Sequence, residues 1–122
     1  PKKLEILGDG NQVKSYLDVR DGVRGVLDIS EKQRNNSSIY NLGHDQTMPV
    51  IKLADIVCDQ MNLKNVKYNF AGGKRGWIGD SPLVHLDTSK AKEYGWYPKI
   101  TIEDGIRQTV KYLLFKNTRR FR

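Results

Sequence analysis

The sequence predicts a single α/β domain with short mixed strands and about four helices. The chain has 122 residues, enough for one domain with a modest core. Short extended apolar runs alternate with segments whose apolar residues recur at helical spacing, which is typical of α/β proteins. Hydrophobic residues make up 38% and charged residues 29% of the chain, so an ordinary globular protein is expected.

The first elements predicted are two extended runs and a helix. Residues 4–7 are expected to form a short strand, closed by the Gly-Asp-Gly-Asn turn of residues 8–11. Residues 13–19 form a second extended stretch, and Asp21 is expected to cap the helix that follows. The inner side of that helix is expected to hold Val23, Val26 and Leu27.

The middle of the chain predicts a strand and the best specified helix. Residues 39–43 are expected to form a compact strand that ends at a glycine. Thr47 is a candidate cap for the next helix, and Pro49 suits its first turn. The apolar residues of this helix fall at helical spacing: Val50, Leu53, Ala54, Val57, Cys58 and Met61.

From residue 66 onward, the sequence predicts two more strands and a short helix. Residues 66–70 are expected to form a strand, followed by a glycine-rich loop over residues 71–80. Residues 84–86 form a second short strand. Asp87 is then expected to cap a two-turn helix that stops at Gly95.

The last helix opens at Thr101-x-x-Asp104, which resembles a capping box. Its inner face is expected to hold Ile102, Ile106, Val110, Leu113 and Leu114. We expect a domain over residues 1–117 and a disordered tail over residues 118–122. The start, Pro1-Lys2-Lys3-Leu4, is no signal peptide, and we expect the sequence to enter a larger protein partway along.

Composition limits the classes of function. No apolar run approaches the roughly 20 residues that span a bilayer, so no membrane span is expected. The single cysteine, Cys58, excludes an internal disulfide and fits a reducing, cytoplasmic compartment; it is expected in the core rather than as a nucleophile. The net charge of +7 fits either a nucleic-acid-binding module or a site for a smaller polyanion such as a nucleotide diphosphate. Composition does not choose between these two.

The first candidate for binding chemistry is the turn that begins at Gly8. Gly8-x-Gly10 is no dinucleotide fingerprint, because Val13 stands at the third glycine position and an extended stretch follows where a helix is required. We interpret the turn as one that directs Lys14 and Gln12 at an anion, since phosphate oxygens need fixed cations or donors. The alternative is an exposed hairpin with a solvated lysine.

The second candidate is the loop over residues 72–80. Four glycines, with Lys74 and Arg75, would let backbone amides and cations approach a phosphate. Trp77 could stack on a base or a sugar, or cover the core. The alternative is a flexible surface loop. No Walker-type lysine arrangement is present, so a triphosphatase loop is excluded.

Metal chemistry is not expected. His44 and His85 are far apart in the sequence, and neither has ligand spacing around it, so each is expected to be structural and no metal site is predicted.

Five motifs occur in a recognisable order: Gly8-Asp9-Gly10-x-Gln12-x-Lys14-Ser15-Tyr16-Leu17-x-Val19-x-Asp21, Tyr40-Asn41-Leu42-Gly43, Arg75-Gly76-Trp77-x-Gly79-Asp80, Leu86-Asp87-x-Ser89-Lys90-Ala91-Lys92 with Gly95-Trp96-x-Pro98, and Ile102-Glu103-Asp104-Gly105-Ile106. Together they resemble the C-terminal, substrate-binding part of the extended short-chain dehydrogenases, the family of UDP-glucose 4-epimerase and the dTDP-glucose and GDP-mannose dehydratases. The resemblance covers roughly residues 4–116. The third motif favours the UDP-glucose 4-epimerase-like branch.

The resemblance implies roles for particular residues. The family usually carries an arginine at the position of Lys14, which contacts the diphosphate of the sugar nucleotide; lysine keeps the charge but loses the bidentate fork. The second diphosphate-binding arginine of the family corresponds to Arg75. Asn41, Asp87 and Lys90 are expected to be structural. The implied ligand is a UDP- or dTDP-linked sugar, held by Lys14, Arg75, Gln12 and Trp77.

The resemblance also implies what this chain lacks. The family's NAD fingerprint and its Tyr-x-x-x-Lys dyad lie in an N-terminal domain, so no cofactor and no catalytic residue are expected here. Tyr112-x-x-x-Lys116 matches the dyad only by coincidence, because no nucleotide-binding unit precedes it. NAD would act in the full-length protein, where it carries the hydride chemistry, and this chain alone is expected to be inactive.

Three functions follow as alternatives. The first is the substrate-binding portion of a nucleotide-sugar epimerase or dehydratase, which would expose an apolar patch and self-associate without its NAD-binding domain. The second is a noncatalytic interaction domain of the same fold. The third is a small basic nucleic-acid-binding module, which lacks an aromatic platform or a recognition-helix pattern.

Overall fold

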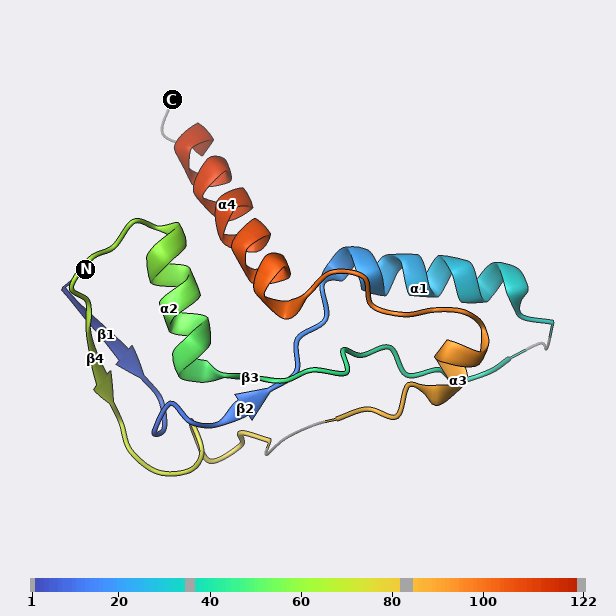
Figure 1. Cartoon of the computed structure of the whole chain (residues 1–122), viewed down its shortest axis with the longest axis horizontal. Helices are drawn as coiled ribbons and strands as arrows, with labels where there is room; N and C mark the ends of the chain where they lie inside the picture. The colour runs from blue at the N-terminus through green and yellow to red at the C-terminus, as the bar shows by residue number, and fades with distance from the viewer. Residues whose placement is uncertain (1, 35–36, 82–84, 121–122) are drawn as a thin grey trace.

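The computed structural model describes residues 2–34, 37–81 and 85–120, and in them four short strands and four helices follow in the order β1-β2-α1-β3-α2-β4-α3-α4. This arrangement confirms the predicted α/β class. Figure 1 shows an elongated molecule with α1 and α3 at one end and the β1–β4 pair, α2 and α4 at the other. The β2–β3 pair lies between the two ends.

The strands form two separate pairs. β1 (Lys3–Ile6) runs parallel to β4 (Lys67–Phe70), so both end at the same edge, where the glycine-rich loop begins. β2 (Val13–Lys14) runs antiparallel to β3 (Met48–Pro49). The strands predicted over residues 4–7 and 66–70 are thereby confirmed, whereas the extended stretch after residue 12 pairs over only two residues.

The first helix, α1 (Val19–Lys32), begins earlier than the sequence predicts. Asp18, with φ −65° and ψ 135°, is its N-cap and accepts a hydrogen bond from the Arg20 backbone N–H at 2.9 Å. The prediction that Asp21 is the cap was therefore wrong. Asp21 lies inside the first turn and is only 2% exposed, because backbone N–H groups from a distant segment bind its carboxylate.

The predicted inner side of α1 was also wrong. Val23, Val26 and Leu27 are 55%, 61% and 57% exposed, whereas Gly25 and Ile29 face the core. The cause is the indole of Trp96: a Cβ built on Gly25 would lie 2.5 Å from its Nε1, so the ring lies directly on the glycine. The apolar stripe of α1 consequently faces outward.

The second helix, α2 (Val50–Gln60), confirms the best specified prediction, with Ala54, Ile56 and Cys58 buried. Met61 lies just beyond its end and is 40% exposed. Thr47 does not cap this helix, contrary to prediction. Because β3 keeps the chain extended through Pro49, the N-cap is Pro49, and no side chain caps the helix.

Two of the predicted strands are not found among the described residues. Residues 39–43 pair with no strand; instead the Tyr40 ring meets that of Tyr94 edge-on at 5.3 Å. Of residues 84–86, Val84 lies outside the described residues, and His85 and Leu86 belong to no strand.

The short helix α3 (Ser89–Glu93) is capped close to where the sequence predicts. Asp87 accepts hydrogen bonds from the backbone N–H and the hydroxyl of Ser89, at 2.9 and 2.6 Å, although the N-cap position itself is Thr88. The predicted stop holds, because Gly95 follows at φ +81°, a conformation that favours glycine.

The last helix, α4 (Ile102–Arg120), opens as predicted: the Asp104 backbone N–H donates to the Thr101 hydroxyl at 3.1 Å. Ile102 is buried, but Leu113 and Leu114 are 52% and 39% exposed. Since α4 extends beyond α2, its predicted inner face is covered only near its start (Figure 1). The helix reaches into the segment predicted as a tail; Phe121 and Arg122 lie outside the described residues.

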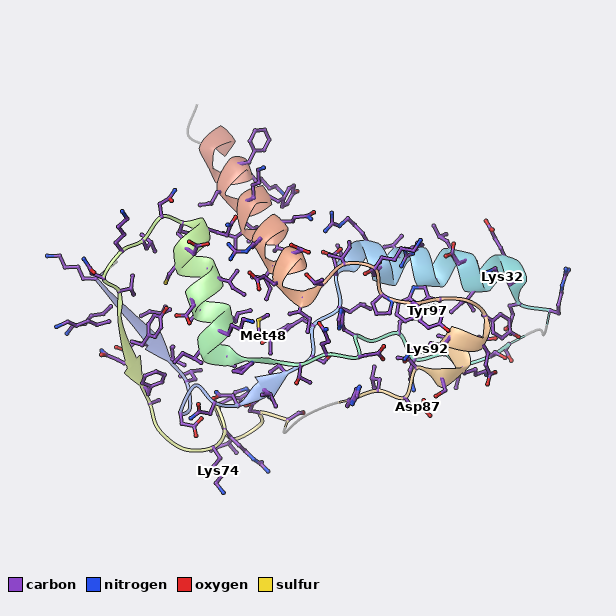
Figure 2. The ribbon with its side chains drawn as sticks, viewed as in Figure 1. Lys32, Met48, Lys74, Asp87, Lys92 and Tyr97 are labelled. Atoms are coloured by element: carbon purple, nitrogen blue, oxygen red, sulfur yellow. The ribbon has the colours of Figure 1, made fainter. Side chains whose placement is uncertain are left out.

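Two small apolar clusters divide the core. One joins Ile29, Ala91 and Trp96 between α1 and α3. The other joins Met48, Ile56 and Ile102, where α2 and α4 meet. Figure 2 shows Met48 near the start of α2, on the side that faces α4. The cleft described next lies beside the second cluster.

Candidate functional site

A cleft of about 380 Å³ lies between the β1–β2 segment, α2 and the loop over residues 71–81. The predicted residues Gln12, Lys14 and Trp77 line it, together with Tyr16 and Asp80. Arg75 is not among the lining residues, but its neighbour Gly76 is. The cleft therefore gathers the turn after β1 and the glycine-rich loop, which the sequence separates by more than fifty residues.

The turn after β1 needs its glycines. Gly8 and Gly10 have φ of +81° and +79°. A Cβ on Gly8 would lie 2.6 Å from Gln12 Nε2, and one on Gly10 would lie 2.6 Å from the Phe70 ring. Glycine thus allows the turn to close against Phe70 and lets Gln12 fold back on it.

Gln12 braces the turn. Its Nε2 donates to the Leu7 carbonyl at 2.6 Å, while its Oε1 is buried with no hydrogen-bond partner. On the other side, the Val50 backbone N–H donates to the Gln12 carbonyl at 3.0 Å. The turn is therefore held to β1 and to the start of α2, which fixes the direction in which Lys14 leaves β2.

Lys14 crosses the cleft to the glycine-rich loop. Its Nζ lies 2.6 Å from Asp80 Oδ1 and also donates to the Ser81 carbonyl. The second carboxylate oxygen, Asp80 Oδ2, accepts from the Gly76 backbone N–H at 3.0 Å. A cation and a backbone amide thus converge on one carboxylate. We call the pair of donors, Lys14 Nζ and Gly76 N–H, the anion site.

The charges around the anion site act on its neighbours. The hydrogen bond from Lys14 holds the pKa of Asp80 below its usual value, and the Gly76 amide and the charge of Arg75 act in the same direction. Burial raises the pKa of Tyr16, although Lys14 opposes this shift. At neutral pH the site therefore presents a charged carboxylate and a neutral phenol.

The glycine-rich loop carries its side chains in different directions. Arg75 and Trp77 are exposed, Trp77 by 64%. Figure 2 shows Lys74 pointing away from the body of the molecule, so it does not enter the cleft. The loop closes on itself through the Asp80 backbone N–H, which donates to the Trp77 carbonyl at 3.0 Å. Only the Gly76–Asp80 part of the loop faces the anion site.

Asp80 and Tyr16 are site residues that reasoning from the sequence missed. Tyr16 stands two residues after Lys14 in an extended stretch, the spacing that puts two side chains on one face. Asp80 ends the Arg75-Gly76-Trp77-x-Gly79-Asp80 motif, yet nothing local indicates that it meets Lys14, 66 residues away. The strand periodicity could have identified Tyr16.

Other residues singled out in the sequence are buried or hydrogen-bonded within the fold, away from the cleft. His44 is buried, and its Nδ1 accepts from the Gln46 backbone N–H at 3.0 Å. Cys58 is buried as predicted, 3.7 Å from the Tyr68 hydroxyl. Asn41 Nδ2 donates to the Asp87 carbonyl at 3.0 Å, which agrees with a structural role.

The Tyr112-x-x-x-Lys116 match gains no support from the geometry. Lys116 Nζ lies 5.7 Å from the centre of the Tyr112 ring on α4, and neither residue lines the cleft. Within residues 2–34, 37–81 and 85–120, no group of three or more His, Cys, Asp or Glu side chains could hold a metal ion. No helix in this described part is long and apolar enough to cross a membrane.

Known proteins resemble the chain over nearly its whole length, although no protein-family model matches it. A dTDP-glucose 4,6-dehydratase of Haemophilus influenzae is 31% identical over an alignment 126 residues long. The alignment covers 96% of this chain and 37% of that protein. A UDP-glucose 4-epimerase of Thermotoga maritima, solved with UDP-glucose, has a TM-score of 0.73 at 30% identity and covers 95% of this chain and 35% of its own.

A third match shows the fold alone. A dTDP-glucose 4,6-dehydratase of Bacillus anthracis, solved in complex with NAD, has a TM-score of 0.71 at 24% identity, over 92% of this chain and 34% of that one. The chain spans about a third of the length of the relatives it matches. Together the matches confirm the resemblance that the five sequence motifs indicate.

Proposed function

Because the chain is a relative of the nucleotide-sugar epimerases and dehydratases and matches about a third of their length, we propose that it is the substrate-binding part of such an enzyme. In this proposal the anion site holds the diphosphate of a UDP- or dTDP-linked sugar. The observation that carries the proposal is the convergence of Lys14 Nζ and the Gly76 N–H on one carboxylate, at 2.6 and 3.0 Å.

A phosphate oxygen needs the same donors as that carboxylate. Charge-assisted hydrogen bonds from a lysine and a backbone amide replace its lost hydration. Arg75 is exposed beside Gly76 and adds a second positive charge to the same loop. Trp77, 64% exposed at the rim, offers a ring for stacking on the base or the sugar. Gln12 braces the turn that carries Lys14.

The turn at Gly8 does not have the geometry of a dinucleotide-binding fingerprint. The turn at Gly8 leads into β2 rather than into a helix N-terminus, and the space beside its glycines is filled by Gln12 and Phe70. No step of hydride transfer is therefore assigned to the described residues. We expect NAD, with the catalytic residues, in the part of the relatives that lies outside the match, and no turnover from this chain alone.

Calorimetry with UDP-glucose and dTDP-glucose tests the proposal. Replacing Lys14 or Arg75 by Ala should weaken binding about tenfold or more each, since a hydrogen bond to a charged group contributes about 1.5–3 kcal/mol. The matched control is Lys52→Ala, which removes a lysine that is 58% exposed and outside the cleft. If the Lys14→Ala, Arg75→Ala double variant bound both ligands with unchanged affinity, the proposed diphosphate-binding role of the two residues would be refuted.

The outward apolar face of α1 favours contact with another part of the whole protein. Val19, Val23, Val26 and Leu27 are exposed by 55–74%, although the opposite side of the helix is buried. A helix that is apolar on two sides is typical of one that lies between two layers. We propose that the NAD-binding part covers this face and that the isolated chain self-associates through it.

Sedimentation velocity tests the exposed face. The isolated chain should sediment as more than a monomer at high concentration, and Val23→Asp with Val26→Asp should restore the monomer. A matched control is Asp28→Asn, which changes a charge on the same helix outside the apolar stripe. A wild-type chain that stays monomeric at all concentrations would contradict the proposal.

A further inference from the structure

The anion site already holds an anion of the protein's own. The carboxylate of Asp80 uses both donors, Lys14 Nζ with one oxygen and the Gly76 N–H with the other. Both side chains are largely covered, with 24% of Lys14 and 16% of Asp80 exposed. The two groups that would bind a phosphate are therefore engaged in the free protein.

We propose that Asp80 is an internal counter-anion, which occupies the anion site in the free protein and is displaced when a diphosphate binds. This inference rests on the proposed function, since it concerns how that site becomes available. Displacement moves the Asp80 carboxylate toward solvent and leaves Lys14 and the Gly76 N–H to the ligand. No bond is made or broken beyond these hydrogen bonds.

The loop is built so that Asp80 can leave. Gly72 and Gly73 have φ of +80° and +85°, and nothing lies within 4 Å of a Cβ built on Gly72. Two backbone hydrogen bonds hold the start of the loop: Ala71 N–H to the Ile6 carbonyl at 2.9 Å and Gly72 N–H to the Gly8 carbonyl at 3.0 Å. Near the cleft, the hydrogen bonds that join the described part of the loop to the rest of the molecule are those that Lys14 donates to Asp80 and to the Ser81 carbonyl.

A diphosphate has the chemistry to replace the carboxylate. It carries more negative charge than one carboxylate and more acceptor oxygens, so it attracts Lys14 and the nearby Arg75 more strongly. Every ligand that uses the anion site must first displace Asp80. The apparent affinity of such a ligand is therefore its intrinsic affinity multiplied by the fraction of molecules in which the site is open. This fraction is the same for all such ligands.

Calorimetry with inorganic phosphate and with pyrophosphate tests the inference on the isolated chain. Asp80→Asn keeps the shape of the side chain but removes its charge. It should bind both probes more tightly than the wild type, by the same factor of roughly three- to tenfold. The matched control is Asp45→Asn, which makes the same charge change and breaks a 2.7 Å ion pair with Lys92 outside the cleft.

Tryptophan fluorescence gives a second readout, because Trp77 lies in the loop that carries Asp80, whereas Trp96 is 1% exposed in the core. Pyrophosphate should change the emission of the wild type, and free Asp80→Asn should already resemble the bound wild type. Trp77→Phe should abolish this change.

The outcomes separate the two proposals. If Lys14→Ala abolishes pyrophosphate binding but Asp80→Asn binds no more tightly than the wild type, the counter-anion role is wrong and the proposed function stands. Weaker binding by Asp80→Asn would likewise overturn the counter-anion role alone. If neither the wild type nor Asp80→Asn binds pyrophosphate, both proposals fail.

Discussion

Two aspartates in different parts of the molecule bind their partners in different ways. Asp21 is 2% exposed and accepts from the backbone N–H groups of Lys99 and Ile100, both at 2.8 Å, and from Arg24 at 2.7 Å. Asp80 is held by a lysine side chain and by one amide of its own loop. Asp21 is enclosed by fixed backbone, whereas Asp80 borders an open cleft.

The surroundings explain the difference. Asp21 lies under Trp96, whose Nε1 donates to the Asp21 carbonyl at 3.0 Å and whose ring rests on Gly25. Removing Asp21 would leave buried donors without acceptors. Around Asp80, the flexible partner Lys14 can turn to another anion. A carboxylate held by rigid backbone is thus part of the fold, and one held by a lysine at a cleft is available for exchange.

The largest expected effect is on the region around Asp21. Trp96→Ala should lower the free energy of unfolding by about 3–5 kcal/mol, because a fully buried indole is lost and a cavity remains. Trp77→Ala, at the rim of the cleft, should change it by at most about 0.5 kcal/mol. Urea unfolding of the two variants measures both values. Similar losses for the two tryptophans would break the comparison.

The next effect concerns the aspartates themselves. Asp21→Ala should lower the free energy of unfolding by about 3 kcal/mol, since it leaves two backbone N–H groups without their acceptor and removes the ion-pair partner of Arg24. Asp80→Ala should leave the urea midpoint nearly unchanged. A larger loss from Asp80→Ala than from Asp21→Ala would show that the cleft, rather than the Trp96 region, stabilises the fold.

A smaller effect is expected at the N-cap of α1. Asp18→Ala should cost about 1 kcal/mol at pH 7, because the cap of the helix is lost. The hydrogen bond from Arg20 holds the pKa of Asp18 below its usual value of 3.8, so this contribution is present above pH 3.8 and is lost as the pH falls through the lowered value.

Unfolding at pH 7 and at a series of acidic pH values checks the sign. The difference between the wild type and Asp18→Ala should shrink only below pH 3.8. A difference that grows on acidification would contradict the assigned cap.

The smallest effect is expected on the outward face of α1. Val23→Ser should change the free energy of unfolding of the monomer by no more than about 0.5 kcal/mol, because the side chain is already 55% exposed. Ile29→Ala, on the inward face, should cost about 2–4 kcal/mol. Equal costs would mean that the helix packs with its apolar stripe inward, as the sequence first suggests.

Local patterns predicted most of the elements but gave the wrong buried face for α1. The helical spacing of apolar residues located α2, although the helix begins later than the predicted Thr47 cap, and the Thr101–Asp104 box located the start of α4. The orientation of α1 could not be predicted, because its apolar stripe and its packed face differ. That choice depends on Trp96 meeting the Asp21 carbonyl, 75 residues away.

The pairing of strands and of charged side chains is also hard to predict, because it joins segments that are far apart in the sequence. The run at residues 39–43 has the composition of a strand, but a strand forms only where a partner lies alongside, and none does here. In the cleft, turn and glycine patterns indicated Lys14, Gln12 and Trp77. The ion pair between Lys14 and Asp80 joins segments 66 residues apart and follows from no local pattern.

The most direct measurement follows the carboxyl carbons of Asp21 and Asp80 and the Gly76 amide by NMR while pyrophosphate is added. The Asp80 and Gly76 signals should shift along one saturation curve, as the ligand takes the donors that Asp80 releases. The Asp21 signal should stay in place. If Asp80 and Gly76 do not shift at concentrations that saturate binding, the diphosphate binds elsewhere and the central claim is wrong.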